Sequence, residues 1–219
     1  MTLRQHFDER LEEVRSDVIR MGGVARDMVK MAIDAALNGE IELAAEVVRM
    51  DDEVDSLEED LVQKTVLVVM QESPVGRDLH LLAATLGVIG EIEKVADDAV
   101  KLARRATKLT TQFPAEMKSA LSEMGDHVRH SFASAIKLYT EYDDDLASQI
   151  IKSDKLIDTK YKEARNRVFE LIRKNPDATE QLVRTIEVFH ALEHVADHAV
   201  EIACRLQLHH GRAAATASA

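Results

Sequence analysis

Four pairs of acidic residues stand four positions apart, at equivalent places of a duplicated sequence, and could together bind metal ions. Residues at this spacing share one face of an α-helix, where like charges repel by roughly 0.2–0.5 kcal/mol. An arrangement that occurs twice despite this cost suggests a ligand outside the helix. The pairs are Glu93 with Asp97, Glu193 with Asp197, Asp51 with Asp55, and Asp154 with Asp158.

The chemistry of these pairs favours a cation with hard oxygen ligands. Carboxylates suit magnesium, calcium, manganese or iron, and a nearby histidine would extend the choice to zinc. We therefore predict two equivalent carboxylate metal sites, one in each half of the chain. The competing interpretation is a solvated acidic face in each half, and the spacing alone does not separate the two.

The duplication itself is visible along most of the chain. Residues 92–103 return as residues 192–203, and both copies place apolar residues on one helical face. Earlier in the chain the matching positions are 103 apart, as in Met21-Gly22 and Met124-Gly125. Each half is therefore expected to be one copy of the same structural unit.

Six long helices must position the acidic pairs. Their apolar periodicity places them at about residues 7–37, 41–70, 79–109, 115–142, 143–174 and 178–209. Turns near Pro74 and Pro176 would fold the second helix of each half against the third as an antiparallel hairpin. Packed helices lie about 8–10 Å apart, so the two acidic pairs of each hairpin should sit at the same height.

The fold class predicted is all-α, with six long antiparallel helices in two tandem three-helix bundles. We expect the first bundle over residues 1–112, the second over residues 113–210, and a flexible tail over residues 211–219. The composition agrees, because leucine, valine, isoleucine, alanine and methionine must form a core in which only 4% of residues are aromatic.

The charge and the chain ends narrow the class of function. A net charge of −12 argues against nucleic acid as a partner, since such proteins need a basic surface. The first residues lack the apolar core of a signal peptide, and no run is long enough to cross a bilayer. We expect a cytoplasmic protein that reaches a membrane only through partners. Cys204, the single cysteine, is expected to be a buried, inert thiol.

Histidines near the second site carry weaker signals. His190, Glu193 and His194 match the H-x-x-E-H order of one metallopeptidase class, but the first half lacks both histidines. Glu187 and His190 form one E-x-x-H, whereas a di-iron centre of the ferritin type needs two. His194 and His198 could add ligands to the second site, although ordinary surface histidines are the commoner case. We predict no catalytic residues.

These motifs in this order make the chain similar to the PhoU family of phosphate-transport regulators, over about residues 3–209. The family carries a repeated (E/D)-x-x-x-D motif, which reads EKVAD at residues 93–97 and EHVAD at residues 193–197. Residues 51–55 and 154–158 supply the preceding acidic pairs, and Met21-Gly22-Gly23 also resembles the family. Many members have Arg-Ile-Gly before the last aspartate, where this chain has Lys94-Val95-Ala96 and His194-Val195-Ala196.

The resemblance implies a duplicated three-helix fold and iron, zinc, manganese or magnesium ions at the acidic motifs. It also implies a cytoplasmic adaptor, often a homodimer, that binds a phosphate ABC transporter through its ATPase subunit and a sensor histidine kinase. Such an adaptor represses phosphate uptake and the phosphate-starvation response when phosphate is plentiful. Two alternatives stay open: a carboxylate-bridged metal hydrolase or oxidoreductase, and a purely structural dimeric scaffold.

Overall fold

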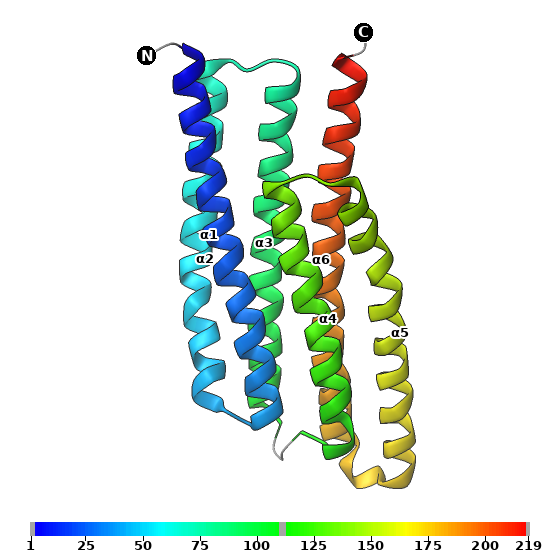
Figure 1. Ribbon diagram of the computed structural model, residues 1–219. Coiled ribbons are helices and arrows are strands. Elements are labelled where there is room, and N and C mark those ends of the chain that lie inside the picture. Colours follow the sequence, from blue (N-terminus) through cyan, green and yellow to red (C-terminus); the bar gives the residue numbers. More distant parts are fainter. Residues whose placement is uncertain (1–2, 110–112, 218–219) are drawn as a thin grey trace.

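The chain folds into long helices that lie roughly parallel or antiparallel to one another (Figure 1). The computed structural model describes residues 3–109 and 113–217, and within them it contains helices and connections but no strand. The all-α prediction with six long helices is therefore confirmed. The elements are α1 (Leu3–Asn38), α2 (Ile41–Glu72), α3 (Arg77–Thr107), α4 (Ala115–Thr140), α5 (Asp144–Lys174), the short 3₁₀ helix η1 (Pro176–Ala178) and α6 (Thr179–Ala217).

Local signals in the sequence explain where several helices end. Gly39 follows α1 with a φ of 75°, and its N–H donates to the Ala35 carbonyl, as a C-terminal glycine does. Asp143 caps the start of α5, because its carboxylate accepts a 2.6 Å hydrogen bond from the Leu146 N–H. Ser73 ends α2 with a left-handed φ of 46° immediately before Pro74.

The two repeats lie side by side and share one core. Helices α1, α2 and α3 pack together, as do α4, α5 and α6, and the repeats meet where α3 packs on α6 and α1 on α4 (Figure 1). One continuous cluster of buried apolar residues draws on all six helices. The bundles are therefore joined through their interior and not only by a linker. The predicted boundary at residue 112 lies just outside the described residues.

The α1–α4 contact depends on a glycine in each helix. A Cβ atom built on Gly22 would lie 2.7 Å from the Cδ1 of Ile136, and one built on Gly125 would lie 2.9 Å from the Cδ1 of Ile33. Gly125 is the counterpart of Gly22, and Ile136 is the counterpart of Ile33; the members of each pair stand 103 residues apart. The same pair of small and large residues thus packs twice, once from each repeat, and the missing Cβ atoms allow the close approach.

Two expectations about the C-terminal helix differ from the structure. The pattern predicts an end near residue 209, whereas α6 continues to Ala217, where a run of alanines favours helix. The tail predicted for residues 211–219 is therefore helical up to residue 217, and residues 218–219 lie outside the described part. Cys204 is exposed, not buried. No helix among the described residues is long and apolar enough to span a membrane.

Candidate metal centre and the charged layer between the repeats

The first acidic face lies between α2 and α3, at the height that the hairpin predicts. Burial raises the pKa of Asp51, and the charges of Asp55 and Asp97 raise it further. Burial likewise raises the pKa of Glu93, with help from Asp97 and from Asp55 across the hairpin. The four predicted carboxylates of this repeat therefore lie close enough to repel one another. A cation between them would relieve that repulsion.

Glu58 is an additional member of this face that the sequence analysis did not single out. Its charge also raises the pKa of Glu93. The signal was present, since Glu58 stands three residues after Asp55 and seven after Asp51, on the same side of α2. Lys101 supplies a counter-charge, with its Nζ 3.5 Å from the Oδ2 of Asp97.

The second acidic face repeats the arrangement between α5 and α6. The pKa of Asp197 is raised to about 6, first by burial and then by the charges of Glu193 and Asp154. The pKa of Asp154 is raised by burial and by Asp158. Asp158 also pairs with Lys162 at 3.0 Å, which supplies part of the missing positive charge. All four predicted carboxylates of this repeat are thus linked through their electrostatic effects.

Histidines make the second face chemically different from the first. One ligand atom from each of His190, Glu193 and His194 lies within 4.8 Å of the others, and no other group of three such residues in the described part of the chain is this close. The Nε2 atoms of both histidines lie 3.9 Å from the Oε2 of Glu193. All three side chains are half-buried. The mixed nitrogen and oxygen donors suit zinc or iron better than magnesium.

In the sequence these histidines are a weaker signal, because the first repeat lacks them. Gly90 and Lys94 occupy the equivalent positions there. His198, the other histidine considered as a ligand, faces elsewhere. It belongs to a charged layer between α3 and α6 that sequence reasoning missed.

This charged layer is built on two buried carboxylates of α3, Glu91 and Asp98, each 3% exposed at its side chain. The Nδ1 of His198 lies 2.9 Å from the Oε2 of Glu91, and its Nε2 lies 3.4 Å from the Oδ2 of Asp98. Arg205 donates to the Oε1 of Glu91 at 2.8 Å. Lys101 donates to Asp98 at 2.9 Å. Each of the two buried carboxylates is therefore paired with a basic side chain of α6, and Asp98 is also paired with Lys101 of its own helix.

The pKa values in the layer follow from these bonds. Burial acts to raise the pKa of Glu91 and of Asp98, but hydrogen bonds from His198 and the neighbouring lysines outweigh it, so both pKa values fall. Burial acts to lower the pKa of His198, yet its hydrogen bonds to Asp98 and Glu91 raise it overall. The layer thus favours ionised carboxylates beside a protonated imidazole. The only sequence signal was that Asp98 and His198 occupy equivalent positions of the duplicated stretch with opposite charge.

The same interface shows the twofold relation between the repeats. Arg105 donates to the backbone carbonyl of Glu187 at 2.9 Å. Arg205, one repeat later, lies against Gly87, where an added Cβ would be 3.1 Å from its Cδ. Arg105 thus contacts residue 187 and Arg205 contacts residue 87, and these two positions stand 100 residues apart just as the two arginines do. This relation orients α3 and α6 antiparallel about their middle.

The fold and the site together define a duplicated all-α protein with one acidic face in each repeat. The PhoU domain family matches residues 18–106 and residues 121–206, one copy in each repeat. The chain belongs to the PhoU family.

Relatives and solved structures agree with this assignment. The chain is 28% identical over 201 residues to a phosphate-specific transport system accessory protein PhoU homolog of Pseudomonas putida, covering 91% of this chain and 78% of that protein. A homolog of Pseudomonas aeruginosa with the same name is also 28% identical, covering 92% of this chain and 84% of that protein. The crystal structure of PhoU from Pseudomonas aeruginosa superposes with a TM-score of 0.88 at 27% identity, over 93% of this chain and 98% of that one. A PhoU structure from Streptococcus pneumoniae, at 18% identity and a TM-score of 0.85, shares the fold over 93% of this chain and 96% of that one.

Proposed function

We propose that this chain is a cytoplasmic accessory protein of a phosphate transport system. In this proposal it represses phosphate uptake and the phosphate-starvation response when phosphate is plentiful. The observation that carries the proposal is that the chain contains two PhoU domain matches and aligns over most of its length with relatives named for this system. Its partners are the ATPase subunit of a phosphate ABC transporter and a sensor histidine kinase.

An exposed apolar stripe on α2 supports docking of a partner helix. Val62, Val66 and Met70 stand four residues apart on one face and are 36%, 41% and 71% exposed. Leu67, three residues before Met70 on the same helix, is 42% exposed as well. Contiguous apolar surface of this kind is typical of interaction sites. The transporter subunit is the partner assigned to it here.

A genetic test separates this role from a structural one. In a strain lacking the gene and grown in abundant phosphate, secreted alkaline phosphatase should be high, and the wild-type gene should return it to low. A Val66→Asp, Met70→Asp variant should be folded yet fail to restore repression. Leu156→Asp is the matched control, because Leu156 is 45% exposed on α5 and lies outside the stripe. Low enzyme activity in the deletion strain would contradict the proposed function.

The proposal includes metal ions at the two acidic faces. In the first repeat Asp51, Asp55, Glu93 and Asp97 would hold the ion, and in the second repeat Asp154, Asp158, Glu193 and Asp197 would do so. The close approach of His190, Glu193 and His194 supports a second-repeat ion bound in part by imidazole. Such an ion would tie the helices of each hairpin together and stabilise the shape that partners recognise.

Elemental analysis tests the metal sites directly. Chelator-treated protein would be incubated with iron, zinc, manganese or magnesium, dialysed, and analysed for bound metal. Asp97→Ala with Asp197→Ala should remove most of the metal, and His190→Ala with His194→Ala should remove only the second ion. Asp52→Ala is the control, an exposed neighbour of Asp51 outside the faces. Equal metal content in all variants would reject the sites.

The protein is also proposed to form a homodimer, as the family resemblance implies. Light scattering coupled to size-exclusion chromatography would measure its mass. A monomeric mass at micromolar concentration would reject this part without affecting the regulatory role.

A further inference from the structure

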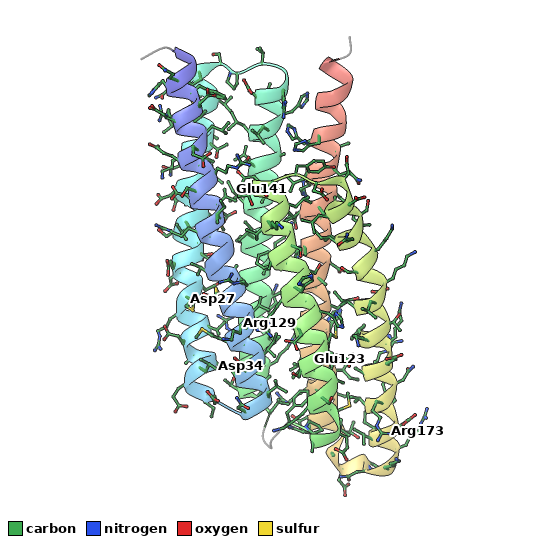
Figure 2. All side chains as sticks on the ribbon, viewed as in Figure 1. Asp27, Asp34, Glu123, Arg129, Glu141 and Arg173 are labelled. Carbon is green, nitrogen blue, oxygen red and sulfur yellow. The ribbon has the colours of Figure 1, made fainter. Side chains whose placement is uncertain are left out.

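A cleft of about 320 Å³ opens near the end of the molecule that carries both chain termini, away from both acidic faces. It exists because α4 ends at Thr140 and the chain turns into α5, while α1, α3 and α6 continue past that turn (Figure 1). Figure 2 marks this turn with the label of Glu141. The basic and aromatic side chains that line the cleft come from α1, α3, α4, α6 and the turn after α4: Arg15, Arg77, Tyr139, Tyr142, His209 and His210.

His209 is the group in the cleft that most needs a ligand. His209 is only 5% exposed, and its Nδ1 has no hydrogen-bond partner among the residues that the structure describes. A buried polar atom that has lost water without gaining a partner is costly, and such atoms are rare in folded proteins. Because His209 lines the cleft, a ligand there could supply the missing partner.

Other side chains of the cleft are held by contacts with neighbouring residues. The ring of His210 stacks on Tyr142, with centroids 3.7 Å apart and planes 6° from parallel. The Tyr142 hydroxyl donates to Asp144 at 2.6 Å. Tyr139 shares a 3.2 Å hydrogen bond with Thr85, and Arg15 donates to the Thr140 carbonyl at the end of α4. A preformed site of this kind binds without first ordering its walls.

Two arginines and two acidic residues line the cleft, and Arg77 is the arginine without an ion pair among the described residues. The two acidic residues belong to α1. The Oε2 of Glu12 lies 4.0 Å from the Nη1 of Arg15, so these two charges form an ion pair, and Asp8 also has an interaction partner. Arg77 forms no ion pair or hydrogen bond with any side chain that the structure describes. It also stands at the first position of α3, where the helix dipole is positive.

The histidines respond to that positive charge. Burial lowers the pKa of His209, and the neighbouring His210, Arg77 and His80 lower it further. Burial and Arg77 likewise lower the pKa of His210, against a smaller opposite effect of Asp144. Burial and Arg77 thus disfavour protonated imidazoles in the cleft, and an anion bound beside them would favour protonation again.

We propose that this cleft binds a phosphate group, as inorganic phosphate or as a small phosphate monoester, through Arg77, His209, His210 and Arg15. A guanidinium presents two parallel N–H groups to two oxygens of such an anion, and the imidazoles add single donors. The apolar side chains of Leu11, Leu81 and Leu206 leave room for a small organic group beside the phosphate. The choice of phosphate among oxoanions rests on the proposed function, whereas the anion site rests on the geometry.

Calorimetric titration of the full chain in phosphate-free buffer tests the proposal. The protein would be treated with chelator first, so that metal-bound phosphate does not contribute. Inorganic phosphate, a nucleoside monophosphate and sulfate would be titrated separately. Saturable binding of phosphate or of the monoester, at least tenfold tighter than that of sulfate, is expected, and which of the two binds identifies the source of the group.

Two variants assign the binding to the cleft. Arg77→Gln should weaken binding roughly tenfold or more, the usual scale for losing a charged hydrogen bond. His209→Leu should weaken it similarly while keeping or raising the thermal midpoint, because it removes an unpartnered buried nitrogen. Arg173→Gln is the matched control at the far end of α5, labelled in Figure 2, and should bind as the wild type does. Asp97→Ala with Asp197→Ala should also leave binding unchanged.

Three outcomes would overturn the proposal: no saturable binding of phosphate or monoester, equal binding of sulfate, or unchanged binding by both Arg77→Gln and His209→Leu. None of them depends on a partner protein. Failure here therefore leaves the alkaline phosphatase test of the proposed function intact, and failure of that test leaves the binding result intact.

Discussion

The Nδ1 of His198 on α6 lies 2.9 Å from the Oε2 of Glu91 on α3, so a hydrogen bond joins the two repeats inside the bundle. The Glu91 side chain is almost fully buried and also accepts from Arg205 and Lys94. Buried carboxylates are rare unless they are paired. The layer therefore pairs buried charges of α3 with basic side chains of α6 at one place along the two helices.

Replacing Glu91 by glutamine should destabilise the protein by about 1–3 kcal/mol, because His198 and Arg205 lose a charged acceptor in a buried place. Urea unfolding followed by circular dichroism would measure the change. Glu59→Gln, an exposed change on α2, should stay within about 0.5 kcal/mol of the wild type. Equal effects of the two variants would show that the layer contributes nothing to stability.

The same layer predicts a dependence of stability on pH. The pKa of His198 is raised in the folded state, so its contribution is complete below its ordinary pKa of about 6.5 and is lost as pH rises through the folded-state value. The pKa values of Glu91 and Asp98 are lowered, so their contributions are present above about pH 4 and are lost as pH falls. The layer should thus stabilise most between about pH 4.5 and 6.5. His198→Asn should flatten the decline of unfolding free energy from about pH 6 to pH 9; an unchanged slope would contradict this assignment.

Alanine should have opposite effects on stability at Gly22 and at its neighbour Gly23, because only Gly22 packs closely against α4. Gly22→Ala should cost about 1–3 kcal/mol relative to Gly23→Ala, because the new methyl meets Ile136 at 2.7 Å whereas nothing lies within 4 Å of Gly23. Gly23→Ala should itself stabilise the helix by roughly 0.5–1 kcal/mol. Combining Gly22→Ala with Ile136→Val should restore part of the loss. Thermal unfolding of the four proteins would show whether the contact behaves in this way.

Asp197 connects stability to metal binding. Its folded-state pKa of about 6 exceeds the ordinary value, so the metal-free protein should lose stability as pH rises from about 4 through 6. Asp197→Asn should therefore stabilise the metal-free protein above pH 6, by about 1 kcal/mol after allowance for solvent screening. The same variant should lose the stabilisation that added zinc or manganese gives the wild type. Scanning calorimetry with and without metal measures both effects, and a variant that metal still stabilises fully would exclude Asp197 as a ligand.

The cap of α5 provides a local prediction. Asp143→Ala should cost about 0.5–2 kcal/mol, since it removes the carboxylate that accepts from the Leu146 N–H. Asp145→Ala removes an acidic residue from the same first turn without removing the cap, and should cost less. Chemical denaturation of both variants distinguishes a hydrogen bond from a general effect of charge. Equal losses would mean that only the charge matters.

Much of the fold could be predicted because the helical signals are local. Apolar residues three and four apart define each helix, and Gly39, Pro74 and Asp143 mark ends that the structure retains. The hairpin register followed from counting residues on either side of Pro74, which places Asp51 and Asp55 opposite Asp97 and Glu93. These relations depend on residues close in sequence or joined by a short turn. The chain therefore determines them without reference to the rest of the molecule.

The relation between the repeats was decided only by the tertiary structure. Helix α3 is apolar on more than one side, so its periodicity does not say which side receives α6, nor that Glu91 and Asp98 would be buried there with His198. For the same reason the pattern placed Cys204 inside, whereas the structure exposes it. The cleft around His209 depends on α4 ending earlier than its neighbours in space. By itself the sequence determined the helices, the duplication and the acidic pairs, because these follow from local spacing; the buried charges and the cleft arise where distant helices meet, and such contacts leave no fixed spacing in the chain.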